Sequence, residues 1–247
     1  MRVETLAPSC PADGARRTTA SVGFFRLVAA VAGKDVRVEL RSREILYTMA
    51  FFAVTVAVVF SFAFVRDRKV IAEAVPGIVW GALAFAATLG LGRAFDRERE
   101  SDTMRALLLS PAPRLAIFLG KALAMTAVIG LVAAVIAPVS IVLYDLDVGR
   151  AGGRLLLLVA LGVIGLAVVG TVFSAMLLRV RARDVLLPVI LYPLLLPLFL
   201  AATRGTAALL SPTGSTDEAW FWIQFLVVYD ALFIVTALWT FEALVIE

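Results

Sequence analysis

The residues best suited to chemistry are a run of alternating charges and a short apolar segment after it, within residues 93–121. Acidic and basic side chains three apart can lie side by side on a helix, and Ser101 or Asp102 can cap a following short helix. The apolar face of that helix needs a membrane or a groove in another protein to pack against. We therefore expect docking of a soluble partner rather than a merely solvated loop, through Arg97, Glu98, Arg99, Glu100, Asp102, Met104, Leu107 and Leu108.

Asp230 is the second candidate, because it is the one ionisable residue well inside a long apolar run. A carboxylate at the centre of a bilayer costs about 2.5–3.5 kcal/mol on insertion scales, so the side chain should face protein or a polar cavity. Tyr229, Tyr192 and Thr236 are possible neighbours. A structural hydrogen bond and a role in transport are both open.

Other kinds of chemistry lack their usual residues. The chain has no histidine, which removes the commonest general base, metal ligand and axial heme ligand. Its single cysteine, Cys10, excludes an internal disulfide and a CxxC redox pair. No GxxxxGK[ST] phosphate-binding motif occurs. We expect no catalytic or metal site here, and energy for active transport would have to come from another protein.

Long apolar runs must position these candidates. The chain has 247 residues, of which 62% are hydrophobic, and a mean hydropathy of +0.97, which indicates an integral membrane protein. About 20 apolar residues suffice to cross a bilayer. We predict an all-α protein with a disordered tail over residues 1–21 and one transmembrane domain over residues 22–247. Its six expected spans are 45–65, 74–92, 122–144, 155–178, 185–203 and 219–241.

Residues 22–44 join an apolar half to a charged half, which predicts an amphipathic helix in the membrane interface, with its arginines facing phosphates and water. An ordinary juxtamembrane linker is the alternative. The basic residues then set the orientation. Alternate loops counted from the N-terminus carry 17 Lys and Arg residues, and the other loops carry 6. The positive-inside rule places both termini and the 93–121 loop in the cytoplasm.

Small residues predict where helices approach one another closely. Gly77 and Gly81 are four apart in the second span, and the fourth span holds Gly162, Gly165 and Gly170. Such spacing favours helix packing within the chain or across a homodimer.

Several strings resemble one known family, the CcmB proteins, which are heme exporter B subunits of cytochrome c maturation. They are VPGIVWGALAF, RAFDRERESDTMRALLLSP, the KALA that opens the third span, PVILYPLLLPLFLAA and the C-terminal FEALVIE. The similarity covers residues 22–247. It implies an ABC-2-type permease of the bacterial inner membrane, with an interfacial helix and a cytoplasmic coupling helix.

The resemblance also implies partners. Two copies would work with two copies of a separate CcmA-like ABC ATPase, which binds the ATP. A CcmC-like heme-handling membrane protein and a small CcmD-like helper would join them. Heme would be the transported or handled ligand, or ATP would drive release of a heme-loaded chaperone. The missing histidine favours mechanical coupling.

Other functions remain open at this point. An ABC-2 permease could export a drug, lipid or polysaccharide instead. A carrier could couple protons or ions through Asp230, although we find no inverted repeat. A passive assembly scaffold would look the same in sequence. An intramembrane enzyme fits least, because no nucleophile–base pair or metal set is present.

Overall fold

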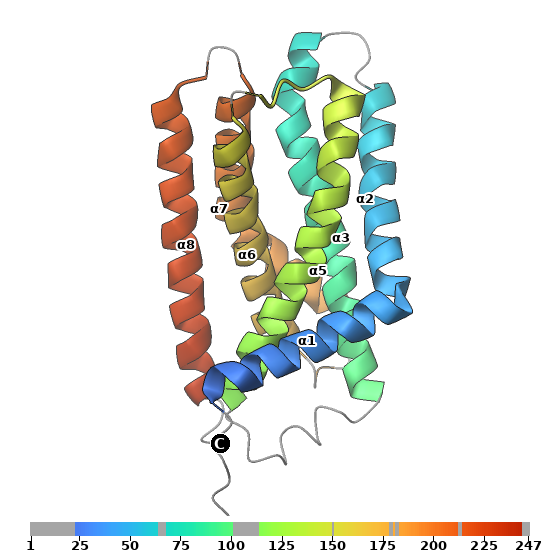
Figure 1. The fold of residues 1–247 in the computed structure, drawn as a ribbon, viewed down its shortest axis with the longest axis vertical. Helices are drawn as coiled ribbons and strands as arrows, with labels where there is room; N and C mark the ends of the chain where they lie inside the picture. Colours follow the sequence, from blue (N-terminus) through green and yellow to red (C-terminus); the bar gives the residue numbers. More distant parts are fainter. Residues whose placement is uncertain are drawn as a thin grey trace, which may run out of the picture.

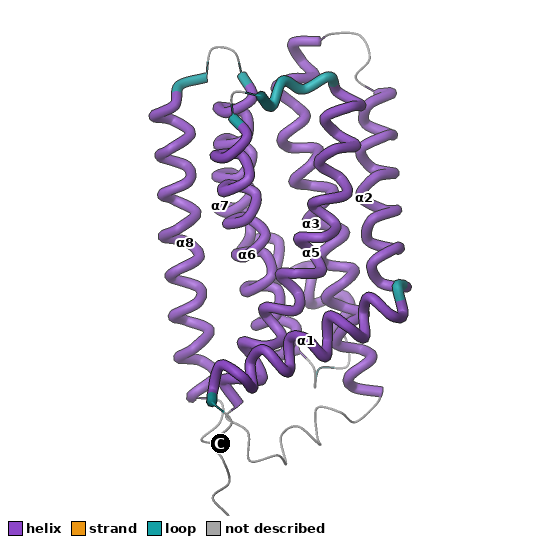
Figure 2. Tube along the Cα trace, in the orientation of Figure 1, coloured by secondary structure: helices purple, strands orange, loops and turns teal. Residues whose placement is uncertain are grey.

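The computed structural model describes residues 23–63, 68–100, 114–149, 151–177, 180, 183–211 and 214–243. In these ranges the chain is helical, and short turns join the helices (Figures 1 and 2). The helices are α1 (Phe24–Ser42), α2 (Glu44–Ala63), α3 (Arg68–Glu100), α5 (Arg114–Tyr144), α6 (Gly152–Met176), α7 (Arg183–Leu210) and α8 (Thr216–Ala243). The predicted tail over residues 1–21 lies outside the described residues.

Six of these helices are long and apolar enough to cross a membrane, which confirms the predicted fold class. They stand side by side in one bundle, with α2 at one edge and α8 at the other (Figure 1). Among the six candidate spans, those of α3 and α6 are the most buried inside the protein, and those of α2 and α8 are the most exposed. The core therefore sits around α3 and α6, while the apolar faces of the edge helices suit contact with lipid.

Helix α1 does not run with the bundle but lies across one end of it, near the C-terminal end of α8 (Figure 1). It ends at Arg43, whose left-handed conformation (φ 58°) lets the Arg43 N–H donate to the carbonyl of Glu39. The buried Glu39 carboxylate also accepts from the backbone N–H of Leu46 at 3.2 Å. These bonds fix the sharp turn into α2, and the arrangement is the one expected of an interfacial helix.

Two spans extend beyond their predicted ends. Helix α5 begins at Arg114 and α7 ends at Leu210, whereas the uncharged runs cover residues 122–144 and 185–203. In both cases a basic residue interrupts the apolar run without interrupting the helix. Lys121 is buried beside Asp35 of α1, and Arg204 lies on the exposed face of α7. A charged side chain leaves the backbone hydrogen bonds of its helix intact, so hydropathy places the start of α5 too late and the end of α7 too early.

Candidate coupling region and intramembrane site

The predicted docking loop begins and ends on the side of the bundle that carries α1. Helix α3 continues as far as Glu100, six residues past Ala94, where its candidate span ends. Helix α5 begins at Arg114 at the same end of the bundle (Figure 1). The backbone of residues 97–100 thus belongs to α3, and their side chains are not described. Asp102, Met104, Leu107 and Leu108 lie outside the described residues.

The start of α5 is fastened to α1. A Cβ atom on Gly120 would lie 2.7 Å from Cβ of Val31 and 3.1 Å from the carbonyl oxygen of Val28, so a glycine lets the two backbones meet there. Beside it, Lys121 Nζ lies 3.6 Å from Asp35 Oδ2, and only 5% of Lys121 is exposed. Asp35 also pairs with the exposed Lys34, at 3.1 Å. Sequence reasoning missed this junction, although the lysine of the KALA string was its signal.

A second, weaker contact joins α2 and α3 on the same side. Arg93 lies 3.8 Å from the carboxylate of Glu44 and donates to the Thr48 hydroxyl at 3.4 Å. Both charged side chains are largely exposed, so the pair contributes at most about 1 kcal/mol. Above it, Met49 of α2 packs where a side chain on Gly90 would otherwise sit. The packing of Met49 holds the two helices together more firmly than the ion pair does.

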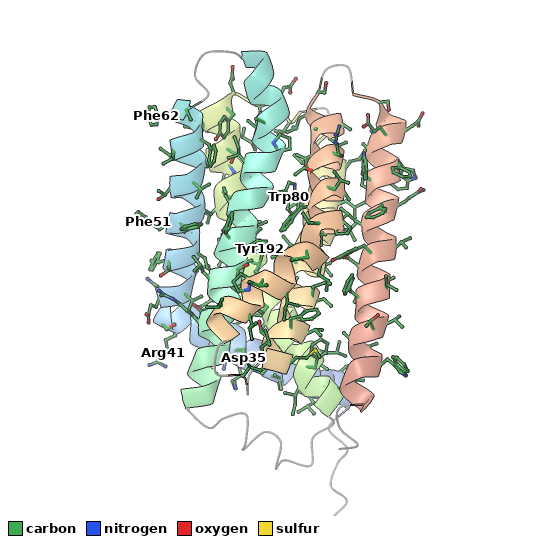
Figure 3. The ribbon with its side chains drawn as sticks, turned by 180° about the vertical axis from the view of Figure 1, so that it is seen from behind. Asp35, Arg41, Phe51, Phe62, Trp80 and Tyr192 are labelled. Atoms are coloured by element: carbon green, nitrogen blue, oxygen red, sulfur yellow. The ribbon has the colours of Figure 1, made fainter. Side chains whose placement is uncertain are left out.

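Trp80 is the main polar anchor of the core that sequence reasoning missed (Figure 3). It is 3% exposed, and its Nε1 donates to the Thr206 hydroxyl of α7 at 3.0 Å. That hydroxyl donates in turn to the carbonyl of Ala202 at 2.7 Å. The indole ring lies over Gly162 of α6, where a Cβ atom would overlap it. One side chain from the VPGIVW string therefore ties α3 to both α6 and α7.

The other predicted packing glycines divide into two groups. Gly165 and Gly170 of α6 lie against neighbouring helices, and Gly170 admits the side chain of Leu91 from α3. In contrast, Cβ atoms added to Gly77 and Gly81 would meet nothing within 4 Å. No described helix of this chain packs on Gly77 or Gly81. Their use by a second copy of the chain stays a prediction.

Asp230 faces protein, as predicted, and is 5% exposed. A Cβ atom on Gly165 would overlap Asp230 Oδ1 and the side chain of Leu198 of α7. The three suggested neighbours are engaged elsewhere. The Tyr229 hydroxyl donates to the carbonyl of Leu194 at 3.0 Å, the Thr236 hydroxyl donates within α8, and the Tyr192 ring packs on Phe85 of α3, all without reaching the carboxyl group.

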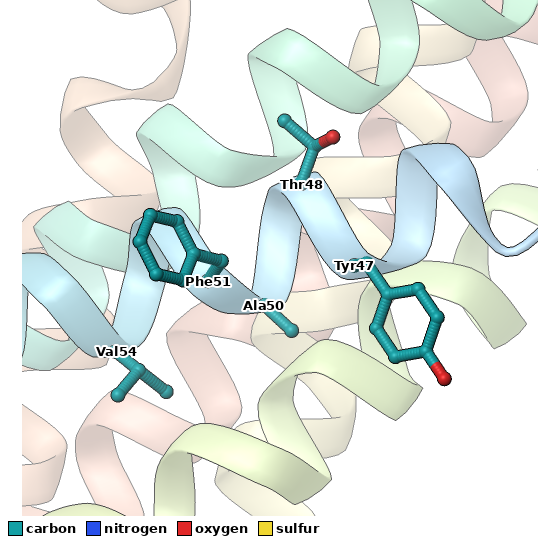
Figure 4. Close-up of a pocket in the computed structure, with 5 residues that line it drawn as sticks. All are labelled: Tyr47, Thr48, Ala50, Phe51 and Val54. Atoms are coloured by element: carbon teal, nitrogen blue, oxygen red, sulfur yellow. The ribbon is translucent and has the colours of Figure 1, made fainter.

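A shallow depression on the outer face of α2 is lined by Tyr47, Thr48, Ala50, Phe51 and Val54 (Figure 4). All five residues belong to one helix, and Phe51 points away from the bundle (Figure 3). The depression is therefore a feature of the lipid-facing surface and not a passage between helices. Among the described residues, no group of His, Cys, Asp and Glu could hold a metal ion.

Comparison with known proteins then adds the family context. The family model described as CcmB protein matches residues 26–245 of this chain. Heme exporter protein B of Pseudomonas aeruginosa is 28% identical over 178 residues, covering 72% of this chain and 79% of that protein. Heme exporter protein B of Bradyrhizobium diazoefficiens is 27% identical over 183 residues (74% and 82%). That of Rhodobacter capsulatus is 30% identical over 171 residues (68% and 77%).

Proposed function

Because this chain belongs to the CcmB family, we propose that it is the membrane subunit of a bacterial heme exporter that serves cytochrome c maturation. The match over residues 26–245 carries this proposal, because it includes all six candidate spans and nearly all of α1. As a permease subunit the chain is a non-catalytic, multi-pass membrane protein, and ATP hydrolysis belongs to a separate CcmA-like ATPase.

That ATPase would bind the loop between α3 and α5. Three observations support this assignment. The loop is bounded by α3 and α5, the ends of these two helices that border it lie on the side of the bundle where α1 lies, and its sequence has apolar residues flanked by charged ones. The contact between α5 and α1 would also transmit movement from the ATPase to the rest of the bundle. A push on the start of α5 would also move α1 through Gly120 and the Lys121–Asp35 pair.

The handled ligand would be heme, either passed through the complex or carried by a chaperone that ATP turnover releases. A CcmC-like heme-handling protein and a CcmD-like helper would complete a complex with two copies of this chain. The absence of histidine supports mechanical release, because direct heme ligation here would have to use Met, Tyr or the single cysteine, Cys10.

Deletion of the gene tests the function. The deletion strain is expected to lose mature c-type cytochromes, detected by heme staining of membrane proteins, and a plasmid copy should restore them. Pull-down of the tagged protein in mild detergent should bring down a separate ABC ATPase with measurable ATP hydrolysis. Normal cytochrome c levels in the deletion strain, with loss of a drug, lipid or polysaccharide export activity instead, would show that the protein is an ABC-2 permease for that other substrate.

The orientation of the bundle is a separate prediction. In a Cys10→Ser background, single cysteines placed near Asp147 and near Gly214 should react with membrane-impermeant maleimides added outside, and one placed near Glu100 should not. Asp147 and Gly214 lie at the end of the bundle opposite α1, whereas Glu100 lies beyond the other end. The excess of basic residues on the Glu100 side supports a cytoplasmic location for that side. The reverse labelling pattern would overturn this topology.

A further inference from the structure

Where α8 packs against α6 and α7, the carboxyl group of Asp230 is buried without a hydrogen-bond partner among the described residues. We call this contact the Asp230 seam, made by Asp230, Gly165 and Leu198. Both carboxyl oxygens are buried, and neither has a hydrogen-bond partner among the described residues. Any side chain larger than that of glycine at position 165 would push the carboxyl group away. The seam is therefore closed tightly over an unpaired acid.

No charge from the packed helices compensates this acid within the described part of the chain. On α6, Arg154 is exposed and eleven residues from Gly165, which is about 16 Å along a helix. On α7, Arg204 is exposed, and the Tyr192 ring packs on Phe85 of α3.

The other titratable groups around α8 are engaged or distant. On α5, Lys121 pairs with Asp35, and the Tyr144 hydroxyl donates to the carbonyl of Ala57. On α8 itself the Tyr229 hydroxyl donates to Leu194, and the acids of the first turn are exposed. The seam thus offers an ionised carboxylate neither a donor nor a positive charge.

We propose that the Asp230 seam is a proton-dependent latch, closed while Asp230 is the neutral acid and opened when it ionises. A neutral acid is tolerated in an apolar contact, whereas an unpaired carboxylate is not. When α8 moves away from α6, water enters, the O–H bond of the acid breaks, and the proton passes to water. Closure takes one proton back. This inference concerns the movement of helices and does not rest on the proposed function.

Infrared spectroscopy of the purified full-length protein in lipid nanodiscs tests the latch. The wild type minus Asp230→Asn difference spectrum at neutral pH is expected to show the C=O band of one protonated carboxyl group. The matched control is Asp217→Asn, which removes an exposed aspartate from the first turn of the same helix. It should show no such band, because the Asp217 carboxyl group is exposed at the end of the helix and is not enclosed in an apolar contact.

Thermal unfolding gives a second readout. At acid pH Asp230 is protonated in both the folded and the unfolded chain, so it adds no pH dependence there. An ionised Asp230 is tolerated in the unfolded chain and not in the closed seam, so folding stability is expected to fall as the pH rises. The apparent Tm of the wild type should drop by about 3 °C or more from mildly acid to mildly alkaline pH, relative to Asp230→Asn.

The outcomes separate cleanly. A carboxylate band of Asp230 at neutral pH, or parallel Tm profiles for wild type and Asp230→Asn, would overturn the latch. Should Asp230→Asn fail to fold, Gly165→Ala decides the question. The added methyl group parts the seam, so the protonated-carboxyl band should be lost at lower pH than in the wild type. An unshifted band in Gly165→Ala would contradict the proposal.

Discussion

Replacing Leu107 by aspartate is expected to abolish binding of the ATPase while the protein still reaches the membrane. Apolar anchors seated in a partner's groove carry most of the binding energy in such contacts. An aspartate at this position would place an unpaired charge in an apolar contact, which costs several kcal/mol. A loss of 3 kcal/mol lowers affinity by a factor of about 150. Co-purification and stimulation of ATP hydrolysis measure the effect.

The matched variant is Arg99→Ala, which removes a charge from the rim of the same loop. Exposed ion pairs contribute only about 0–1 kcal/mol, so this protein should retain most of its ATPase binding at ordinary salt. Neither change touches a candidate span, and both proteins should appear in the membrane fraction in normal amounts. Normal ATPase stimulation by Leu107→Asp would show that the 93–121 loop is not the coupling site.

Trp80→Ala is expected to lower the free energy of unfolding by about 3–5 kcal/mol. The change empties the space over Gly162 and removes the donor to Thr206, so α3 loses its contacts with α6 and α7 at one point. For a chain of this size each kcal/mol lowers Tm by about 2–4 °C. Thermal unfolding of the purified protein in detergent measures this difference.

Two companion variants isolate the cause. Trp239→Ala removes the same side chain from α8, where it is 75% exposed, and should change stability by less than about 0.5 kcal/mol. Trp80→Phe keeps much of the ring and loses the hydrogen bond, so about 1 kcal/mol should separate it from the wild type beyond the loss of packing. If Trp80→Ala and Trp239→Ala unfold together, Trp80 is not an anchor.

The membrane-spanning elements could be predicted because hydrocarbon thickness dictates the length of an apolar run. Each of the six predicted spans corresponds to one helix, and the helix across the bundle end was expected from residues 22–44. The ends of α5 and α7 were misplaced because hydropathy treats every charge as a boundary. Lys121 has a partner and Arg204 is exposed on a helix face, and both facts depend on the folded structure.

The candidate site shows the same division. That Asp230 faces protein followed from the cost of exposing a carboxylate to lipid, and the structure confirms it. The sequence could not predict that Asp230 contacts Gly165 rather than another glycine. The spacing of glycines along one helix does not show which neighbouring helix each glycine faces. The same limit explains why Gly77 and Gly81 looked like packing positions and contact no described helix. Trp80 stood inside a quoted string, yet its partner Thr206 lies 126 residues away.

The continuity of α3 has a mechanical consequence. The helix runs unbroken from Arg68 to Glu100, and its one proline, Pro76, lies before Trp80. From Trp80 to Glu100 it extends about 30 Å at 1.5 Å per residue, without a proline to bend it. This part of α3 is a stiff lever arm, and its fulcrum is the pair of contacts nearest Glu100, Gly90 against Met49 of α2 and Leu91 against Gly170 of α6. A sideways pull at Glu100 would therefore load the Trp80 contact with α6 and α7 in the opposite direction.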